Sequence, residues 1–113
     1  MNNRIRFRHL RKYNTRKPLG TMTTIEGEND IIYVGFAFCS SGDYFSKKMG
    51  RELSQARAET ARENQSRTES PKSWCVKTTH KDIIEFINYL KEKKVYNHKT
   101  YIHLAKNKFK DGK

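Results

Sequence analysis

IIYVGFAFC, residues 31–39, is the longest apolar run of the chain, and the expected fold is built around it. Its β-branched, aromatic and small residues are typical of a β-strand. Successive residues of a strand point to opposite faces, and here both sets are apolar: Tyr33 and Ala37 on one face, Val34 and Phe36 on the other. We therefore expect this strand to be the central and most buried one.

Two more strands are expected before this run. Leu19–Ile25 is threonine-rich, and the turn residues Gly27–Asp30 would join it to the apolar run as a β-hairpin. Arg4–His9 alternates strictly, so a strand there would present three arginines on one face. The alternative for residues 1–17 is a disordered basic arm that orders on a partner, because the segment holds seven Lys or Arg and no acid.

Helical patterns dominate after the run. From Asp43 to about Asn64 the period is helical. The expected apolar stripe of this helix consists of Phe45, Met49, Leu53 and Ala56. Residues 64–72 form a polar linker, and Trp74–Val76 is either a fourth strand or a plug over the core.

Thr79 is expected to cap a second helix, with Asp82 in its first turn. The buried face of this second helix would consist of Ile83, Phe86, Ile87 and Leu90. A short third helix is expected around Thr100–Phe109, overlapping a lysine-rich tail at residues 106–113.

Together these patterns predict one small α+β domain over residues 1–113. It would contain an antiparallel sheet of about three strands, or four, with two main helices packed on one face and a short C-terminal helix. A chain of 113 residues matches the usual size of one domain.

The charge balance points to an anionic partner. The chain has 24 Lys and Arg against 12 Asp and Glu, a net charge of +12. Nucleic acid is the commonest partner of small basic proteins, ahead of acidic protein surfaces. The apolar run is far shorter than the roughly 20 residues of a membrane-spanning helix, and the arginine-rich N-terminus does not resemble a signal peptide, so a cytoplasmic protein without membrane contact is expected.

The turn after the apolar run is a candidate phosphate site. Ser40, Ser41 and Gly42 would precede a helix N-terminus, whose amides and dipole attract anions. The simpler interpretation is an ordinary N-cap by Ser41 or Asp43. Cys39 lacks a neighbouring base, so a buried cysteine is favoured over a nucleophile.

Basic side chains form the main candidate interface, either for nucleic acid or for an acidic protein surface. The candidates are Arg4, Arg6, Arg8, Arg11, Lys12, Lys47, Lys48 and Arg51. They are expected to gather on one side of the molecule. Tyr13 and Tyr44 are candidates for stacking on unpaired bases.

Residues 35–53, GFAFCSSGDYFSKKMGREL, resemble stretches of small basic proteins encoded by bacteriophages. The resemblance implies a short accessory protein made during infection, including an anti-CRISPR or another inhibitor of a host machine. It implies no particular functional residue.

Two functions are therefore expected to compete. The first is non-enzymatic binding of DNA or RNA through phosphate contacts, and the second is inhibition of a host protein or ribonucleoprotein through an acidic surface. No Walker loop, dinucleotide fingerprint or zinc spacing occurs, so no catalytic residue, metal or cofactor is expected. The acids of the hairpin turn could hold a metal for nuclease chemistry, although a solvated turn explains them more simply.

Overall fold

The computed structural model describes residues 4–13, 17–38, 47–64, 68–69, 73–95 and 98–109, and within them five strands form one antiparallel sheet. The strands are β1 (Ile5–Arg11), β2 (Pro18–Glu26), β3 (Ile31–Phe38), β4 (Thr68–Glu69) and β5 (Ser73–Thr79). Their order in the sheet is β1-β2-β3-β5-β4. The helices are α1 (Lys47–Asn64), α2 (His80–Lys93) and α3 (His98–Phe109).

The α+β class and the antiparallel sheet are confirmed. The hairpin forms as β2 and β3, with the Gly27 amide donating to the Ile31 carbonyl at 2.8 Å. The segment around Trp74–Val76 is a strand, because β5 pairs with β3 from Ile31 to Ala37. Residues 5–11 are likewise a strand paired with β2, and β4 lies inside the predicted linker of residues 64–72.

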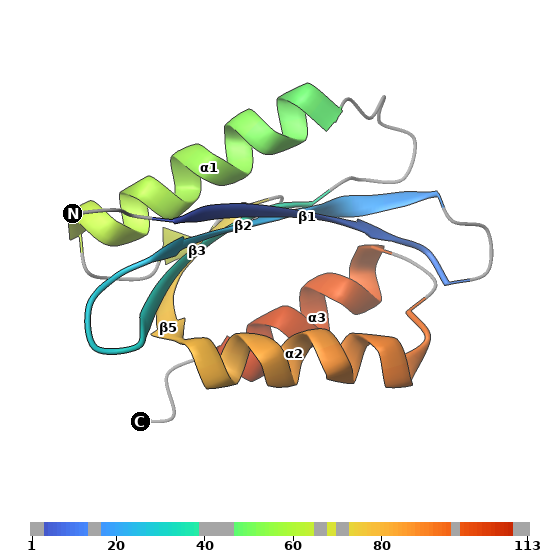
Figure 1. The fold of residues 1–113 in the computed structure, drawn as a ribbon. Helices are drawn as coiled ribbons and strands as arrows, with labels where there is room; N and C mark the ends of the chain where they lie inside the picture. Colours follow the sequence, from blue (N-terminus) through green and yellow to red (C-terminus); the bar gives the residue numbers. More distant parts are fainter. Residues whose placement is uncertain are drawn as a thin grey trace.

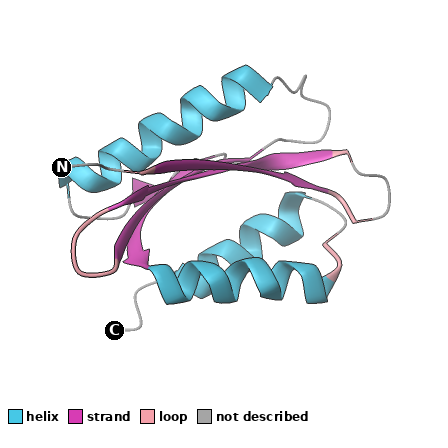
Figure 2. Ribbon diagram, in the orientation of Figure 1, coloured by secondary structure: helices cyan, strands magenta, loops and turns pink. Residues whose placement is uncertain are grey.

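The helices lie on both faces of the sheet, so the prediction that the two main helices share one face is wrong. Figures 1 and 2 show α1 on one side and α2 with α3 on the other. The cause lies in β3, where Val34 and Phe36 pack in the core under α2 and α3, whereas Tyr33 packs with Ala58 and Ala61 of α1. Because both faces of β3 are apolar, each face needs its own cover.

The helix α1 approaches the sheet through small residues. The predicted stripe is wrong at Met49, Leu53 and Ala56, which are exposed, and its first member, Phe45, lies outside the described residues. Met49 and Leu53 are 57% and 44% exposed. The buried positions are instead Gly50, Ser54, Ala58 and Ala61. Larger side chains do not fit because the backbone of α1 lies directly against β3: a Cβ added at Gly35 would clash with the Ser54 carbonyl oxygen and the Ala58 amide.

A polar contact is buried within this tight interface. The hydroxyls of Thr23 on β2 and Ser54 on α1 lie 2.5 Å apart, and Ser54 also donates to the Gly50 carbonyl at 2.6 Å. Both side chains are fully buried, so these hydrogen bonds satisfy groups that burial would otherwise leave unpaired. The contact fixes the position of α1 along β2.

The opposite face carries the larger, aromatic core. The rings of Phe36 and Phe38 on β3 are stacked at a centroid separation of 5.6 Å, and Phe38 meets Tyr101 of α3 edge-on at 4.9 Å. Phe86 of α2 contacts Phe109 at 5.1 Å. The predicted third helix is confirmed, and it extends through the first residues of the predicted 106–113 tail because buried Phe109 anchors its last turn.

The start and the end of α2 follow the local sequence. Thr79 is the N-cap, as predicted, and its hydroxyl accepts a hydrogen bond from the Asp82 amide at 3.2 Å. Lys94 ends the helix in the left-handed conformation, with φ of 52°. None of the described helices combines the length and the apolar character that crossing a membrane requires.

Candidate nucleic-acid interface

β1 is an edge strand, and its two faces differ in chemistry. Arg6 and Arg8 pair with Thr24 and Met22 of β2, and Met22 belongs to the core under α2 and α3. The two exposed arginines therefore lie on the α2 side of the sheet. Phe7 and His9 alternate with them and pair with Thr23 and Thr21 of β2. Thr23 bonds Ser54 of α1, so this second face of β1 is on the α1 side of the sheet.

A hollow of about 580 Å³ lies between β1 and α2. Its polar lining includes Arg6, Arg8, Glu26 and His80, and its apolar lining includes Met22, Ile32, Ile83, Ile84 and Ile87. Glu26 is the only acid that lines it among the described residues. The hollow therefore combines an apolar floor with cationic side chains.

A second hollow of about 210 Å³ continues in the same direction and shares Arg8 and Ile87 with the first. Its cationic lining consists of Arg8, Arg11, Lys91 and Lys94, and its apolar lining includes Leu10, Leu19, Leu90 and Val95. We refer to the two hollows together as the β1–α2 groove. It follows β1 on one side and α2 on the other.

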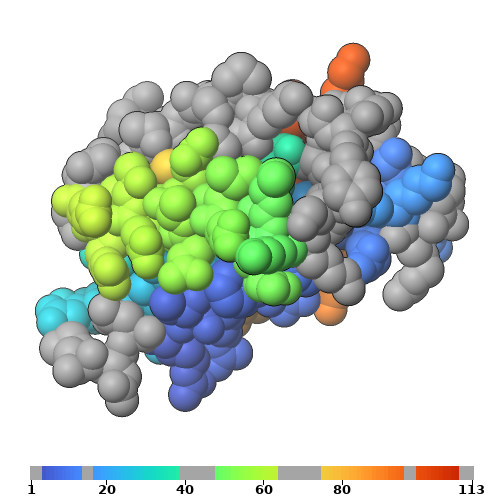
Figure 3. All heavy atoms as spheres, turned by 90° about the horizontal axis from the view of Figure 1, so that it is seen from above, coloured from blue at the N-terminus to red at the C-terminus, as the bar shows by residue number. Residues whose placement is uncertain are grey.

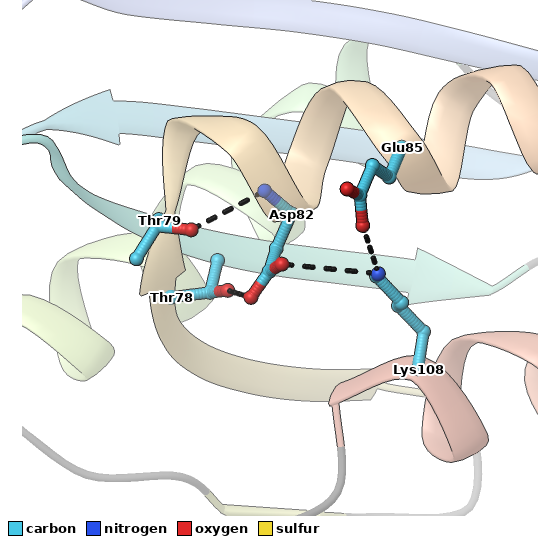
Figure 4. A network of polar contacts seen from close by, with 5 residues as sticks. All are labelled: Thr78, Thr79, Asp82, Glu85 and Lys108. Atoms are coloured by element: carbon cyan, nitrogen blue, oxygen red, sulfur yellow. Dashed lines mark hydrogen bonds and ion pairs between the residues drawn. The ribbon is translucent and has the colours of Figure 1, made fainter.

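Two of the three acids of α2, Asp82 and Glu85, are turned away from this groove. The α2 residues that line the groove, from His80 through Ile84 and Ile87 to Lys91, include no carboxylate. Asp82 and Glu85 instead face α3, where Lys108 Nζ lies 3.8 Å from Asp82 Oδ1 and 2.7 Å from Glu85 Oε1 (Figure 4). The two carboxylates are thereby paired at a distance from the groove.

The electrostatics of the Lys108 network agree with its geometry. The hydrogen bond and the positive charge of Lys108 lower the pKa of the Glu85 carboxyl below its usual value, so Glu85 stays ionised and paired. Asp82 is further held by a hydrogen bond of 3.3 Å from the Thr78 hydroxyl, as Figure 4 also shows. Among the described residues that line the groove, cations therefore outnumber the single carboxylate, that of Glu26.

Tyr13 lies at the far end of the groove, where β1 and α2 meet. Its amide donates to the Val95 carbonyl at 2.7 Å, and Lys94 Nζ lies 5.5 Å from the centre of its ring. The side chain lines the second hollow and is 53% exposed. The predicted stacking residue is therefore accessible beside two lysines of α2, Lys91 and Lys94.

The predicted cations do not gather on one side. Lys48 and Arg51 are exposed on α1, which covers the face of the sheet opposite the groove. Figure 3 views that face and shows α1 in green with the start of β1 in blue beside it. Alternation along β1 directs Arg6 and Arg8 away from α1, so the predicted set divides between two faces.

The remaining candidates occupy varied positions. Arg4 is exposed just before β1, and half-buried Lys12 follows its last residue, with the Lys12 amide bonded to the Lys17 carbonyl at 2.6 Å. Lys47 is the first residue of α1. The predicted phosphate turn, which consists of Ser40, Ser41 and Gly42, lies outside the described residues, as do Cys39 and Tyr44.

Sequence reasoning missed the α2 side of the groove. The expected buried face of α2, which consists of Ile83, Phe86, Ile87 and Leu90, does pack in or against the core. No pattern in the sequence placed Lys91 and Lys94 beside β1. Ile84 lies outside that face and is 46% exposed. An isoleucine outside the expected buried positions was the available signal.

The comparisons with known proteins found no matching family model, no matching curated protein and no matching solved structure. Within the described ranges, no group of three or more His, Cys, Asp or Glu is arranged to hold a metal ion.

Proposed function

We propose that this protein binds nucleic acid in the β1–α2 groove, without catalysing a reaction on it. The observation that carries the proposal is the lining of the groove, where five cations (Arg6, Arg8, Arg11, Lys91 and Lys94) surround an apolar floor, while Asp82 and Glu85 of α2 pair with Lys108 of α3. The phosphate backbone is the anion that a row of exposed cations of this kind fits. A cytoplasmic location, where nucleic acid is accessible, is part of the proposal.

Salt dependence tests this function directly. If five cations each neutralise a phosphate, log K for a single strand falls with log salt at a slope of about −3.5. The experiment is a titration of fluorescently labelled oligonucleotides with the intact protein at several salt concentrations. Binding that is absent at low salt, or that does not weaken as salt rises, would contradict the proposal.

A second candidate function is binding to an acidic segment of a host protein, as an inhibitor does. Its support is the position of β1, which pairs with β2 alone among the described strands and exposes arginines along an edge. An extended acidic segment would add to that edge as a further strand. This candidate agrees with the resemblance to phage proteins.

The two candidates differ in what is retained from a host extract. Nucleic-acid binding predicts that nuclease treatment removes the retained material, and that protein purified at low salt carries a raised 260/280 nm absorbance ratio. Inhibition predicts that one host protein stays bound after nuclease treatment. Retention of that protein by wild type but not by Arg6→Glu would favour the second candidate over the first.

A further inference from the structure

The geometry points to a single strand as the ligand of the β1–α2 groove, with phosphates along the arginines of β1 and at least one base against the isoleucines of α2. This inference rests on the proposed function and names the form of nucleic acid that it concerns. Its basis is that the two walls of the groove differ: one is cationic, and the other is apolar over most of its length.

The β1 wall offers a regular row of charge. Arg6 and Arg8 project from the same face of the strand two residues apart, which corresponds to a separation of roughly 7 Å along an extended strand. That spacing is comparable with the separation of successive phosphates in an extended single strand. Arg11 continues the row into the second hollow. A strand of nucleic acid lying parallel to β1 would therefore place two successive phosphates beside Arg6 and Arg8, with Arg11 further along.

The α2 wall offers an apolar surface opposite the arginines, where the bases of a strand bound along β1 would project. Ile84 is 46% exposed on this wall, beside Ile83 and Ile87. Tyr13 adds an accessible ring at the far end. Unpaired bases are flat and largely apolar, and proteins bind them on such surfaces next to a charged track for the backbone.

A duplex uses only one of these two walls. Its bases are paired and stacked inside, so it would present phosphates to the arginines and nothing to Ile84. A single strand uses both walls. The preference for a single strand over a duplex thus measures the contribution of the apolar wall.

The test compares three labelled ligands of equal length: a thymidine 12-mer, the same strand as a duplex, and an abasic strand carrying the same phosphates. Affinities are measured by fluorescence anisotropy for wild type, Ile84→Gln and Arg8→Gln. Leu53→Gln is the matched control, because Leu53 is 44% exposed in a helix on the opposite face.

We expect wild type to bind the thymidine strand about tenfold more tightly than the duplex or the abasic strand, since stacking and apolar contacts to bases strengthen single-strand binding. Ile84→Gln should weaken binding of the thymidine strand and leave the abasic strand unchanged. Arg8→Gln should weaken binding of both, and Leu53→Gln should change neither.

Three results would overturn the inference, and they are distinguishable. Equal affinity for the three ligands would refute the contact between bases and α2, while nucleic-acid binding through phosphate contacts alone would remain the proposed function. Absence of binding to any of them would remove both the inference and the function. A glutamate-rich peptide of equal charge that displaces the thymidine strand as efficiently as unlabelled thymidine strand would assign the groove to an acidic protein segment.

Discussion

Tyr101 is a fully buried side chain whose hydroxyl has no hydrogen-bond partner among the described residues. It lies between the rings of Phe38 and Phe86, and burial raises the pKa of its phenol well above the usual 10.0. A buried, unpaired polar group costs roughly 1 to 3 kcal/mol. We therefore expect Tyr101→Phe to raise the free energy of unfolding by about 1 kcal/mol.

Urea denaturation across a pH series checks this expectation. Above pH 10 the phenol ionises in the unfolded chain but not in the core, so wild type should lose more stability there than Tyr101→Phe. The difference between them should therefore widen at alkaline pH. A variant less stable than wild type at neutral pH would mean that the hydroxyl makes a hydrogen bond, and would refute the expectation.

Gly35 is a residue of β3 against which the backbone of α1 lies directly. A methyl group there would meet the backbone of Ser54 and Ala58 and lie 2.7 Å from Arg57 Cβ. Because backbone atoms cannot move aside, we expect Gly35→Ala to lower the free energy of unfolding by about 3 kcal/mol. Lys77→Ala, at an exposed position on neighbouring β5, should stay within about 0.5 kcal/mol of wild type. Equal denaturation midpoints for the two variants would contradict this account of the α1 interface.

At the scale of elements, Lys108 of α3 holds two acids of α2. Replacing it by methionine should raise the pKa of Glu85 toward its ordinary value, because the hydrogen bond and the positive charge both disappear. An NMR titration of the Glu85 carboxyl measures this shift. Lys99→Met, which removes an exposed cation from the first turn of the same helix, should leave the pKa of Glu85 unchanged.

The same pair has a pH-dependent effect on stability. Since the folded-state pKa of Glu85 is lowered, its contribution to stability is present above the unfolded pKa and is lost as pH falls through the folded value. The stability difference between wild type and Lys108→Met should therefore be present at neutral pH and vanish in acid. If the stability difference between wild type and Lys108→Met persists unchanged at pH 2, the stabilising effect of Lys108 comes from packing rather than from charge.

Local patterns predicted most elements but not which face each helix covers. The two-sided apolar run of β3 and the Thr79 cap were readable because they depend on neighbouring residues alone. The face that α1 buries was not readable from the sequence, because hydrophobicity alone favours Met49 and Leu53 as the buried residues. The close approach of α1 to Gly35 admits only small residues, such as Ser54 and Ala58. Tertiary geometry decided this face.

At the scale of the whole molecule, the candidate site was only half predictable. The arginines of β1 could be predicted from strict alternation, and Arg6 and Arg8 do line the groove. That these arginines share a groove with Lys91 and Lys94 could not be predicted, because it depends on which face of the sheet α2 covers. For the same reason Lys48 and Arg51 were wrongly grouped with the arginines.

One measurement tests the central claim that nucleic acid binds on the α2 side of β1. It compares Arg6→Gln/Arg8→Gln with Lys48→Gln/Arg51→Gln, two variants that each remove two exposed cations from opposite faces. For a labelled single strand at low salt, the arginine variant should lose about tenfold or more in affinity and flatten the salt slope by about 1.4, whereas the α1 variant should stay close to wild type. An equal loss in both, or a larger loss in the α1 variant, would contradict the account.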